Sequence, residues 1–331
     1  YEYSGQGNST YGYSYTDWYG ANYGVLQTKY RNADGTFNYG MIQDINEQSE
    51  HGSMLVMGKL KNYHNWYGLV STYNTKIGKN FDFYGGIDFR AYKGVHTNEI
   101  LDLYNGKYYI DSSRKNAKAA NNVNASNPDW VNEKLGVGDV MYRDYDGHVV
   151  QEGAFFQTEY VNNDLSAFIA GSLSNTCYWR YDRLYYDKEH AESDTKNYLG
   201  GTIKGGANYN INENHNVFFN AGFISRAPRF STGVFLTSST SNVINPDAKN
   251  EKVVSVEVGY GYRLKWLQVD LNAYWTKWID KTMAKSVSVG ANQVDGYINM
   301  TGVNARHQGI ELEVKASPLY WLDLTGMFSI G

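Results

Sequence analysis

The run Leu267-Gln268-Val269-Asp270-Leu271-Asn272-Ala273-Tyr274-Trp275-Thr276 alternates apolar and polar residues at every step. Successive side chains of a β-strand point to opposite faces, so this run predicts a strand with one apolar and one polar face. Residues 81–92 and 310–315 alternate in the same way. Helical spacing of about 3.6 residues fits none of the three runs. We therefore expect an all-β protein built from two-faced strands.

The polar faces of the expected strands carry ionisable side chains, namely Asp82, Asp88, Arg90, Glu257, Asp270, Glu311 and Glu313. Burying such groups without partners is costly, so these faces are expected to meet water or a polar domain. The opposite faces are apolar enough to meet lipid. A polar face together with polar loops explains how a membrane protein can have a mean hydropathy of -0.56.

The connections between the expected strands alternate between short and long. The short ones are 78–80, 162–163, 212–215, the neighbourhood of Lys265, and 317–318; the long ones are 94–150, 181–196, 227–250 and 279–296. Short turns on one rim and long loops on the other are typical of an outer-membrane β-barrel. Soluble sandwiches instead have turn signals about every 8–12 residues.

The alternation of loop lengths also decides how the first part of the chain divides. A turn at His64-Asn65 would place a tight turn on the long-loop rim, so we interpret 51–77 as one long strand. About ten long strands are expected from residue 51 onward, and residues 1–50 predict an irregular strand and loop. Residues 1–331 are thus expected to form a single domain, an antiparallel transmembrane β-barrel that is partial, with about ten or eleven strands.

Composition excludes several other classes of protein. The 331 residues include 31 Tyr and are 16% aromatic, which argues against disorder. No uninterrupted apolar run of about 18 residues occurs, so no transmembrane helix is expected. A net charge of -4 argues against a nucleic-acid partner, and the single Cys177 excludes a disulfide framework or a cysteine-rich metal site. The chain starts without Met and ends inside an alternating run, so we interpret it as part of a longer protein.

Proline and aromatic residues fit the barrel interpretation. Pro cannot donate to a strand ladder, and Pro128, Pro228, Pro246 and Pro318 all fall in expected loops or turns. Tyr and Trp favour the boundary between membrane and water. The aromatic residues expected at this boundary are Trp66, Trp179, Trp266, Trp275, Trp278, Trp321, Tyr260 and Tyr262. The alternative for them is packing within a soluble β core.

Four motifs follow one another in the last third of the chain. They are Phe223-Ile224-Ser225-Arg226-Ala227-Pro228, Asn245-Pro246-Asp247-Ala248-Lys249-Asn250-Glu251, Tyr297-Ile298-Asn299, and Gly309-Ile310-Glu311-Leu312-Glu313. Their order and spacing resemble the C-terminal barrel half of TonB-dependent outer-membrane receptors, especially those of the Bacteroidetes. In that family the second motif usually reads Asn-Pro-x-Leu-Lys-Pro-Glu, from which Ala248 and Asn250 depart.

The resemblance implies a barrel of about 22 strands filled by an N-terminal plug domain, which lies outside these residues. Such receptors sit in the cell outer membrane and import a scarce ligand (a siderophore, haem, cobalamin or a glycan) with energy relayed by TonB. The implied partners are outer-membrane lipid, the TonB complex through the missing plug domain and, in some members, a surface lipoprotein. No enzymatic activity and no resident cofactor is implied.

The strongest candidate for ligand binding is the aromatic and arginine-rich segment 178–186, at the outer end of an expected strand. Aromatic rings and arginines can stack on sugars or planar ligands and pair with anionic groups. The candidate residues of this segment are Trp179, Arg180, Arg183, Tyr185 and Tyr186, and a second cluster adds Tyr142, Arg143 and Tyr145. The alternative is a strand that extends above the membrane, with its arginines bound to lipopolysaccharide phosphates.

Signals for a metal or for catalysis are weak. Residues 144–147 resemble the start of a calcium loop but lack its further oxygen ligands and closing Glu. His96, His148 and His190 are expected in solvated outer loops, and no zinc-binding pair or nucleophile elbow occurs. Two further functions stay open: a passive porin or surface adhesin, and a soluble all-β carbohydrate-active enzyme with paired carboxylates about 5–10 Å apart.

Overall fold

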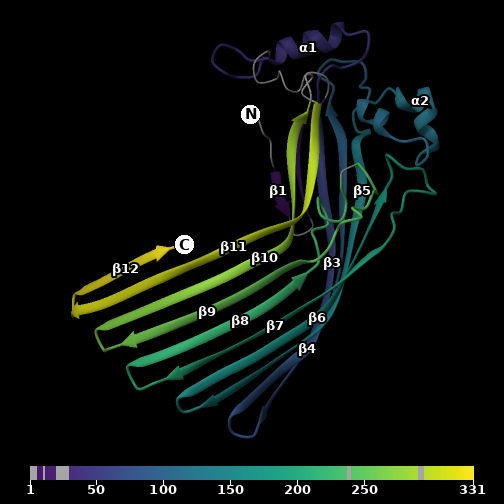
Figure 1. Cartoon of the computed structure of the whole chain (residues 1–331). Coiled ribbons are helices and arrows are strands. Elements are labelled where there is room, and N and C mark those ends of the chain that lie inside the picture. Colours follow the sequence, from purple (N-terminus) through teal and green to yellow (C-terminus); the bar gives the residue numbers. More distant parts are fainter. Residues whose placement is uncertain (1–5, 10–11, 20–29, 237–239, 290–293) are drawn as a thin grey trace.

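A computed structural model describes residues 6–9, 12–19, 30–236, 240–289 and 294–331. Its strands form a single 12-stranded sheet in which the strands follow one another in chain order (Figure 1). Every neighbouring pair is antiparallel, and within the described residues β1 and β12 are not paired with each other. The sheet is therefore an open meander, and the two-sheet sandwich of the soluble alternative is wrong for this part of the chain.

The strands are β1 (Gln6–Ser9), β2 (Gly12–Tyr19), β3 (Val56–Ile77), β4 (Phe81–Asp102), β5 (Val140–Asn162), β6 (Leu165–Asp182), β7 (Lys196–Asn210), β8 (His215–Arg226), β9 (Glu251–Arg263), β10 (Leu267–Val289), β11 (Val294–Leu319) and β12 (Leu322–Ile330). The helices are α1 (Tyr39–Gln48), α2 (Pro128–Val131) and the 3-10 turns η2 (Ser112–Asn116) and η3 (Val123–Ser126). The ten strands expected after residue 51 are confirmed as β3–β12. The described part of the first 50 residues contains β1, β2 and α1, where an irregular strand and a loop were expected.

Strand register places the apolar side chains of neighbouring strands side by side. Leu271 of β10 lies opposite Tyr260 of β9 and Leu312 of β11, and Leu312 lies opposite Phe328 of β12. Because side chains alternate along each strand, the ionisable residues expected on the polar faces all share the other side of the sheet, as in the pairing of Asp270 with Glu313. We call these two sides the apolar face and the polar face.

The apolar face is exposed rather than packed against another layer. Leu173 of β6 is 60% exposed and Leu199 of β7 is 66% exposed. A curved sheet with an exposed apolar face and a polar opposite face is the wall of a transmembrane β-barrel, with its apolar side toward lipid. We call the part of the sheet next to the short turns, such as 154–162 of β5 and 267–275 of β10, the membrane half, and the remainder the loop half.

Short and long connections lie on opposite rims, as expected. The turns 78–80, 163–164, 211–214, 264–266 and 320–321 form one rim, and the connections 103–139, 183–195 and 227–250 form the other (Figure 1). The long strand expected at 51–77 is confirmed as β3, which runs through His64-Asn65 without a turn.

Strands extend further into the loop rim than expected. Residues 94–150 were predicted to be one long loop, yet β4 reaches Asp102 and β5 begins at Val140. Where a long loop was predicted at 279–296, β10 and β11 stay paired up to Val289 and Val294. Pairing with a neighbour satisfies the backbone hydrogen bonds of each strand above the membrane, so the ladder continues beyond the lipid.

Three local predictions are wrong. Pro318 was placed in a turn but lies within β11, where the register shifts between Ala316 and Leu319 and so tolerates a residue without an N–H. The turn itself falls at 320–321. Trp66 and Trp278 were expected at the membrane boundary, but their strand parity places both on the polar face.

The loop half contains small buried cores of the kind found in soluble proteins. Helix α1 packs Ile42 against Tyr30, Phe37 and Leu55. Asn46 fixes the helix to the sheet, because its amide donates to Leu55 O (2.7 Å) and Leu103 O (3.0 Å) while its oxygen accepts from Met54 N (2.8 Å). The loop half is thus held by buried contacts and the membrane half by its strand ladder.

Candidate functional site

Loop 227–250 folds onto the polar face of the loop half. Its residues Val234 and Phe235 are fully buried against Tyr178 of β6. The Phe230 ring approaches β5 so closely that a Cβ on Gly147 would lie 2.8 Å from it, so this contact needs glycine. The loop therefore lines the polar side of the wall at the rim of the long connections.

Arg180 anchors this loop and is not open to solvent. The side chain is fully buried, and its guanidinium donates to Asn242 Oδ1 of the loop (2.6 Å) and to Asp182 Oδ2 (2.7 Å). The guanidinium also lies 4.2 Å from the centre of the Tyr145 ring. Removing one member of a buried ion pair leaves the other charge uncompensated, which makes such a pair costly to break.

Tyr185 and Tyr186 belong to the same anchor. The Tyr186 hydroxyl accepts from the backbone N of Asn242 (2.8 Å), and the Tyr185 hydroxyl donates to Tyr142 O (2.7 Å). Tyr185 lies in connection 183–195, and burial raises the pKa of its phenol above the ordinary value. These two candidate residues therefore hold strands and loop together through their polar tips.

Trp179 lies on the opposite face from Arg180, because odd and even positions of β6 alternate. Arg183 is the first residue after β6 and joins the side of Trp179 through its carboxylate partners on β5. Trp179 stacks on His148 of β5 with ring centres 4.6 Å apart. Arg183 donates to Asp144 (3.1 Å) and Asp146 (2.5 Å), and Lys93 reaches Asp146 at 2.8 Å. The positive charge of Arg183, on the outward side of the predicted cluster, is thus neutralised by aspartates of the same chain.

The second predicted cluster is also divided. Tyr142 has a left-handed backbone, with φ of 65°, and its N–H donates to Asp111 Oδ2 at 2.6 Å. Tyr145 is buried between Arg180 and His96. Both residues therefore shape the wall.

Arg143 has the surroundings of a ligand-binding arginine. Its guanidinium donates to Asn98 Oδ1 (2.8 Å) and Asn62 Oδ1 (3.1 Å). Among the described residues it has no carboxylate partner within ion-pair distance, so its charge is uncompensated there. The buried Nδ2 of Asn62 likewise has no acceptor in this part of the structure. Arginine and amide donors together suit an anionic or carbonyl oxygen.

His96 adds a neutral group to the Arg143 cluster. It was expected in a solvated loop but lies in β4, above the membrane half, with its Nδ1 2.6 Å from Asn62 Oδ1. Burial, and then the charges of Arg143 and Arg180, lower the pKa of His96 to about 4. The imidazole is therefore neutral near pH 7. His148 also lies in a strand, whereas His190 lies in connection 183–195 as expected.

Sequence reasoning missed the inward residues that surround these arginines. Asn62, His96 and Asn98 continue the polar parity of β3 and β4, so period-two counting along the whole of both strands would have found them. It could not find the pocket of about 510 Å³ between β7 and loop 227–250, which Lys196, Tyr198, Asn242 and Ile244 help to line. That pocket depends on loop packing.

The motif residues brace the base of loop 227–250. Arg226 at the end of β8 donates to Glu251 at the start of β9 (2.6 Å), and Glu251 is buried. Asn245 is buried as well and donates to Gly233 O at 3.1 Å. The ion pair thus joins the two ends of the loop, and the Asn245 amide joins two segments within it.

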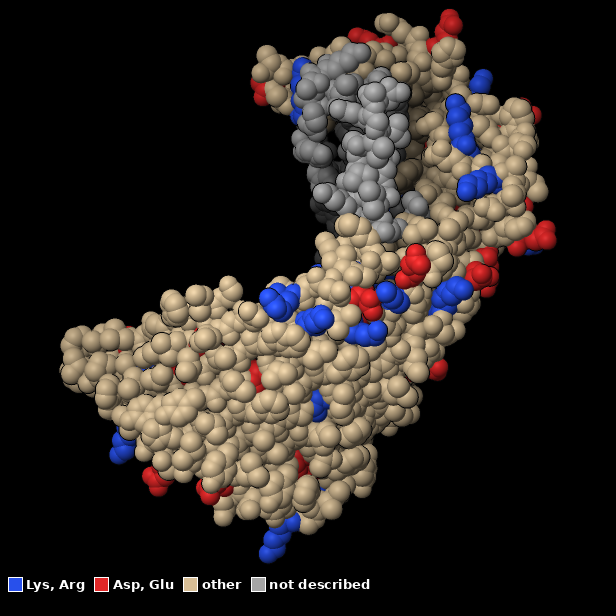
Figure 2. Space-filling model, in the orientation of Figure 1, with Lys and Arg blue, Asp and Glu red and all other residues tan. Residues whose placement is uncertain are grey.

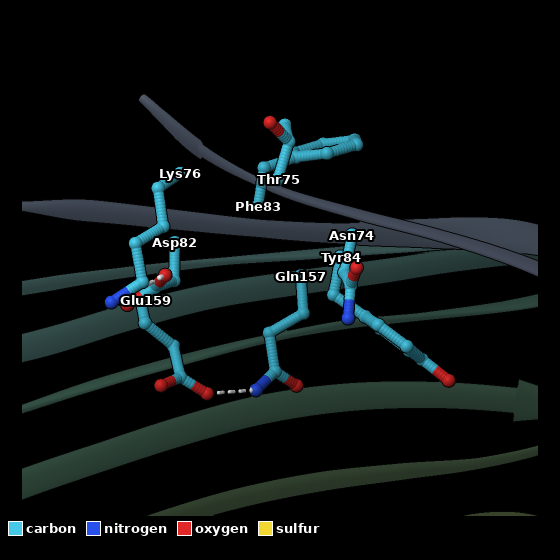
Figure 3. Close-up of a pocket in the computed structure, with 8 residues that line it drawn as sticks. All are labelled: Asn74, Thr75, Lys76, Asp82, Phe83, Tyr84, Gln157 and Glu159. Atoms are coloured by element: carbon cyan, nitrogen blue, oxygen red, sulfur yellow. Dashed lines mark hydrogen bonds and ion pairs between the residues drawn. The ribbon is translucent and has the colours of Figure 1, made fainter. Parts of the chain in front are cut away.

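The polar face of the membrane half is a hydrophilic wall. Figure 3 shows Asp82, Gln157 and Glu159 on one side of the strands and Phe83 on the other, around a pocket of about 540 Å³. Gln157 donates to Glu159 at 2.6 Å. A larger hollow of about 750 Å³ continues across β5–β8 toward Arg263 and Asp270. This wall can therefore contact water or a polar domain inside the barrel.

The described residues contain no group of three or more His, Cys, Asp or Glu side chains placed to hold a metal ion. Asp144 and Asp146, the carboxylates of the calcium-like sequence, both bind Arg183 instead. No helix among the described residues is long and apolar enough to cross a membrane.

A meander of two-faced strands, with short turns on one rim and an inward-folded loop on the other, defines part of an outer-membrane β-barrel. The model of the TonB dependent receptor-like β-barrel family matches residues 1–330, and the chain belongs to this family. Its barrels lie in the outer membrane, as predicted. A search of curated protein sequences found no match.

Solved structures with this fold include the copper transporter OprC, which is 15% identical with a TM-score of 0.55 over 85% of this chain and 39% of that chain. The ferric citrate transporter FecA is 10% identical, with a TM-score of 0.48 over 79% of this chain and 33% of that one. The FrpB iron transporter from Neisseria meningitidis is 11% identical, with a TM-score of 0.46 over 95% and 41%. The chain thus spans well under half the length of these proteins.

Proposed function

We propose that the protein is an active importer that takes a scarce ligand across the outer membrane with energy delivered by TonB. The observation that carries this proposal is the family match over residues 1–330. The polar wall of the membrane half supports it, because that wall offers hydrophilic contacts to a plug domain. The ligand is a siderophore, haem, cobalamin or a glycan, and the motif around Asn245 favours a receptor of the Bacteroidetes type.

Ligand capture in this proposal falls to Arg143 among the candidate residues. Arg143 lies on the polar face near the entrance, and its guanidinium donates hydrogen bonds to the amide oxygens of Asn62 and Asn98. A carboxylate, phosphate or hydroxyl of a ligand would complete its bonds. Arg180, Tyr185 and Tyr186 contribute by holding loop 227–250, while Trp179 and Arg183 face away from the ligand path.

The test uses cells that carry the whole protein and a panel of labelled probes: a ferric catecholate, haemin, cyanocobalamin and an oligosaccharide. We expect one probe to accumulate and an uncoupler of the proton-motive force to abolish its accumulation. Uptake that ignores the uncoupler, or leakage of small sugars without accumulation, would favour the passive porin. Surface binding of cells without uptake would favour the adhesin.

Two variants test where on the wall the probe binds. Arg143→Ala removes the proposed ligand-binding arginine, and Arg183→Ala is its matched control. Losing a hydrogen bond to a charged group costs about 1.5–3 kcal/mol, so Arg143→Ala is expected to weaken binding of the accumulated probe roughly 10- to 100-fold. Arg183→Ala, on the outer side of the same wall, is expected to leave binding unchanged. Equal losses would contradict the inward location of the site.

A further inference from the structure

The Arg143 cluster contains a hydrogen-bond acceptor as well as donors. Arginine has no acceptor atom, so the Asn62 atom that lies 3.1 Å from Arg143 Nη2 is the amide oxygen and not the amide nitrogen. The same oxygen lies 2.6 Å from Nδ1 of His96. Because an amide oxygen only accepts, Nδ1 carries the imidazole proton and donates it to this bond. The imidazole is neutral near pH 7, so its other nitrogen, Nε2, is an acceptor.

The His96 Nε2 atom lies over Gly94, next to a hydroxyl. A Cβ on Gly94 would lie 3.2 Å from Nε2 and 2.9 Å from the Tyr92 hydroxyl oxygen, so both polar atoms gather above this glycine. Asn62 is 7% exposed, and its amide nitrogen has no acceptor in the part of the chain that the structure describes. Strands β2 and β5, which flank β3 and β4 at this height, are both present, so no strand is missing beside the cluster.

A ligand group that satisfies both sides of this cluster accepts from Arg143 and donates to His96. A hydroxyl does both with one atom, because it has an O–H donor and two lone pairs. An ionised carboxylate or phosphate has acceptors only, and it would set its lone pairs against the lone pair of Nε2. The neutral imidazole therefore favours a hydroxyl over an anionic group at this place.

An exposed tryptophan continues this surface toward the membrane half. Trp66 lies directly opposite Tyr92 on the polar face and is 59% exposed. Its ring atoms Cη2 and Cζ2 lie 3.5 and 3.7 Å from the position of a Cβ on Gly68, so the indole leans along β3 over this glycine. Tyr92 in turn stacks on His64, with ring centres 6.1 Å apart. These rings form an aromatic platform against which the C–H face of a sugar ring can pack.

The polar cluster and the aromatic platform are separated along the wall. Asn62 and Trp66 are four residues apart on one face of β3, and His96 and Tyr92 are four apart on β4. At about 3.3 Å per residue, the two rows lie about 13 Å from each other. The upper row belongs to the loop half, where Figure 2 shows charged side chains gathered more densely than over most of the lower sheet. A ligand that contacts both rows is therefore elongated and extends over more than one sugar ring.

We propose that the ligand is a neutral oligosaccharide, which binds Arg143 and His96 through hydroxyls of one sugar ring and packs another ring on Trp66. This inference rests on the proposed function, because it names the ligand of the same import path. His96 is the specificity-determining residue: its acceptor atom rewards a hydroxyl and disfavours the ionised carboxylates that a ligand such as haem would present.

The experiment measures binding to the whole protein, reconstituted in neutral phospholipid vesicles. The probes are an array of neutral oligosaccharides (α- and β-linked glucans, xylans and mannans), with haemin, a ferric catecholate and cyanocobalamin as probes of the other ligand classes. We expect saturable binding of an oligosaccharide and none of the other three probes. Urea titrations in the same vesicles check that each variant below is folded.

Two substitutions of His96 test the acceptor atom. In His96→Asn the side-chain amide reaches only the position of Nδ1, where its nitrogen keeps the bond to Asn62. In His96→Gln the amide reaches the position of Nε2, where its oxygen accepts from a hydroxyl. His96→Asn is expected to weaken oligosaccharide binding roughly 3- to 10-fold, the loss of one hydrogen bond, and His96→Gln is expected to recover most of that loss.

Trp66→Ala tests the platform, with Tyr67→Ala as its matched control. Tyr67 is the next residue of β3, is 69% exposed and lies on the apolar face. Trp66→Ala is expected to weaken oligosaccharide binding roughly tenfold, and Tyr67→Ala less than about twofold.

Three results would each overturn the inference: saturable binding of haemin, the catecholate or cyanocobalamin without binding of any oligosaccharide, equal losses in the two His96 variants, or equal losses in Trp66→Ala and Tyr67→Ala. The first of these leaves the import proposal standing with another ligand. An oligosaccharide that binds as expected but does not accumulate in energised cells would contradict import and would support the ligand assignment.

Discussion

In the membrane half, Leu173 and Leu199 are 60% and 66% exposed, whereas in the loop half Ile42 and Phe235 are fully buried. The same kinds of side chain thus face outward in one half and inward in the other. Apolar burial favours whichever environment excludes water, and below the loop rim that environment is lipid. The comparison teaches that the apolar side chains of one sheet avoid water in two ways. Lipid covers them near the short turns and protein cores cover them near the long loops, with a boundary near Lys277 and Lys93.

The largest expected effect breaks the loop half at its buried ion pair. Arg180→Ala leaves Asp182 buried and uncompensated and removes the bond to Asn242. We expect a loss of about 3–5 kcal/mol in the free energy of unfolding. Urea titrations of the whole protein in bilayers measure it, and faster proteolysis within 227–250 should accompany it.

Arg183→Ala is the control for this prediction. Lys93 continues to pair with Asp146 after the change, and Arg183 is 39% exposed, so the expected loss is below about 1 kcal/mol. A loss as large as that of Arg180→Ala would mean that the outward ion pairs, rather than the loop anchor, stabilise this rim.

The next prediction compares one phenylalanine from each half. Phe235→Ala opens a cavity beside Tyr178 and Val234 and should cost about 3–5 kcal/mol. Phe219→Ala on the apolar face of β8, where Phe219 is 49% exposed, leaves a space that lipid chains fill, so its cost should be about half as large. Equal costs in bilayers would indicate that Phe219 is packed against protein.

A smaller effect concerns the phenol of Tyr185. The pKa of this phenol is raised in the folded protein, so Tyr185 ionises at lower pH in the unfolded chain than in the folded one. The neutral phenol therefore contributes its full stabilisation below pH about 10, and this contribution is lost as the pH rises toward the folded-state pKa. Tyr185→Phe removes the bond to Tyr142 O and should cost about 1 kcal/mol at pH 7. The variant should lose less stability than the wild type between pH 9 and 12; parallel curves would contradict a buried phenol.

The alternation in 267–276 predicted the faces of β10 because strand parity is local and does not depend on distant contacts. The same rule places Trp179 and Arg180 on opposite sides of β6, so treating them as one ligand cluster ignored the pleat. Burial of Arg180 could not be predicted, since Asn242 covers it from 62 positions away along an irregular loop. The ends of β10 and β11 were also missed, because ladder pairing rather than apolar content extends them.

Leu271 and Asn272 offer the most direct test that the apolar face meets lipid. They are adjacent in β10, so depth and strand context are nearly equal, yet they point to opposite faces. Leu271→Arg should cost about 2–4 kcal/mol in bilayers, the penalty for a charge near the midplane of a barrel wall, and Asn272→Arg should cost much less. Unfolding titrations of both variants in the same vesicles give the comparison. Equal losses, or a larger loss for Asn272→Arg, would contradict the assignment of this face to the membrane.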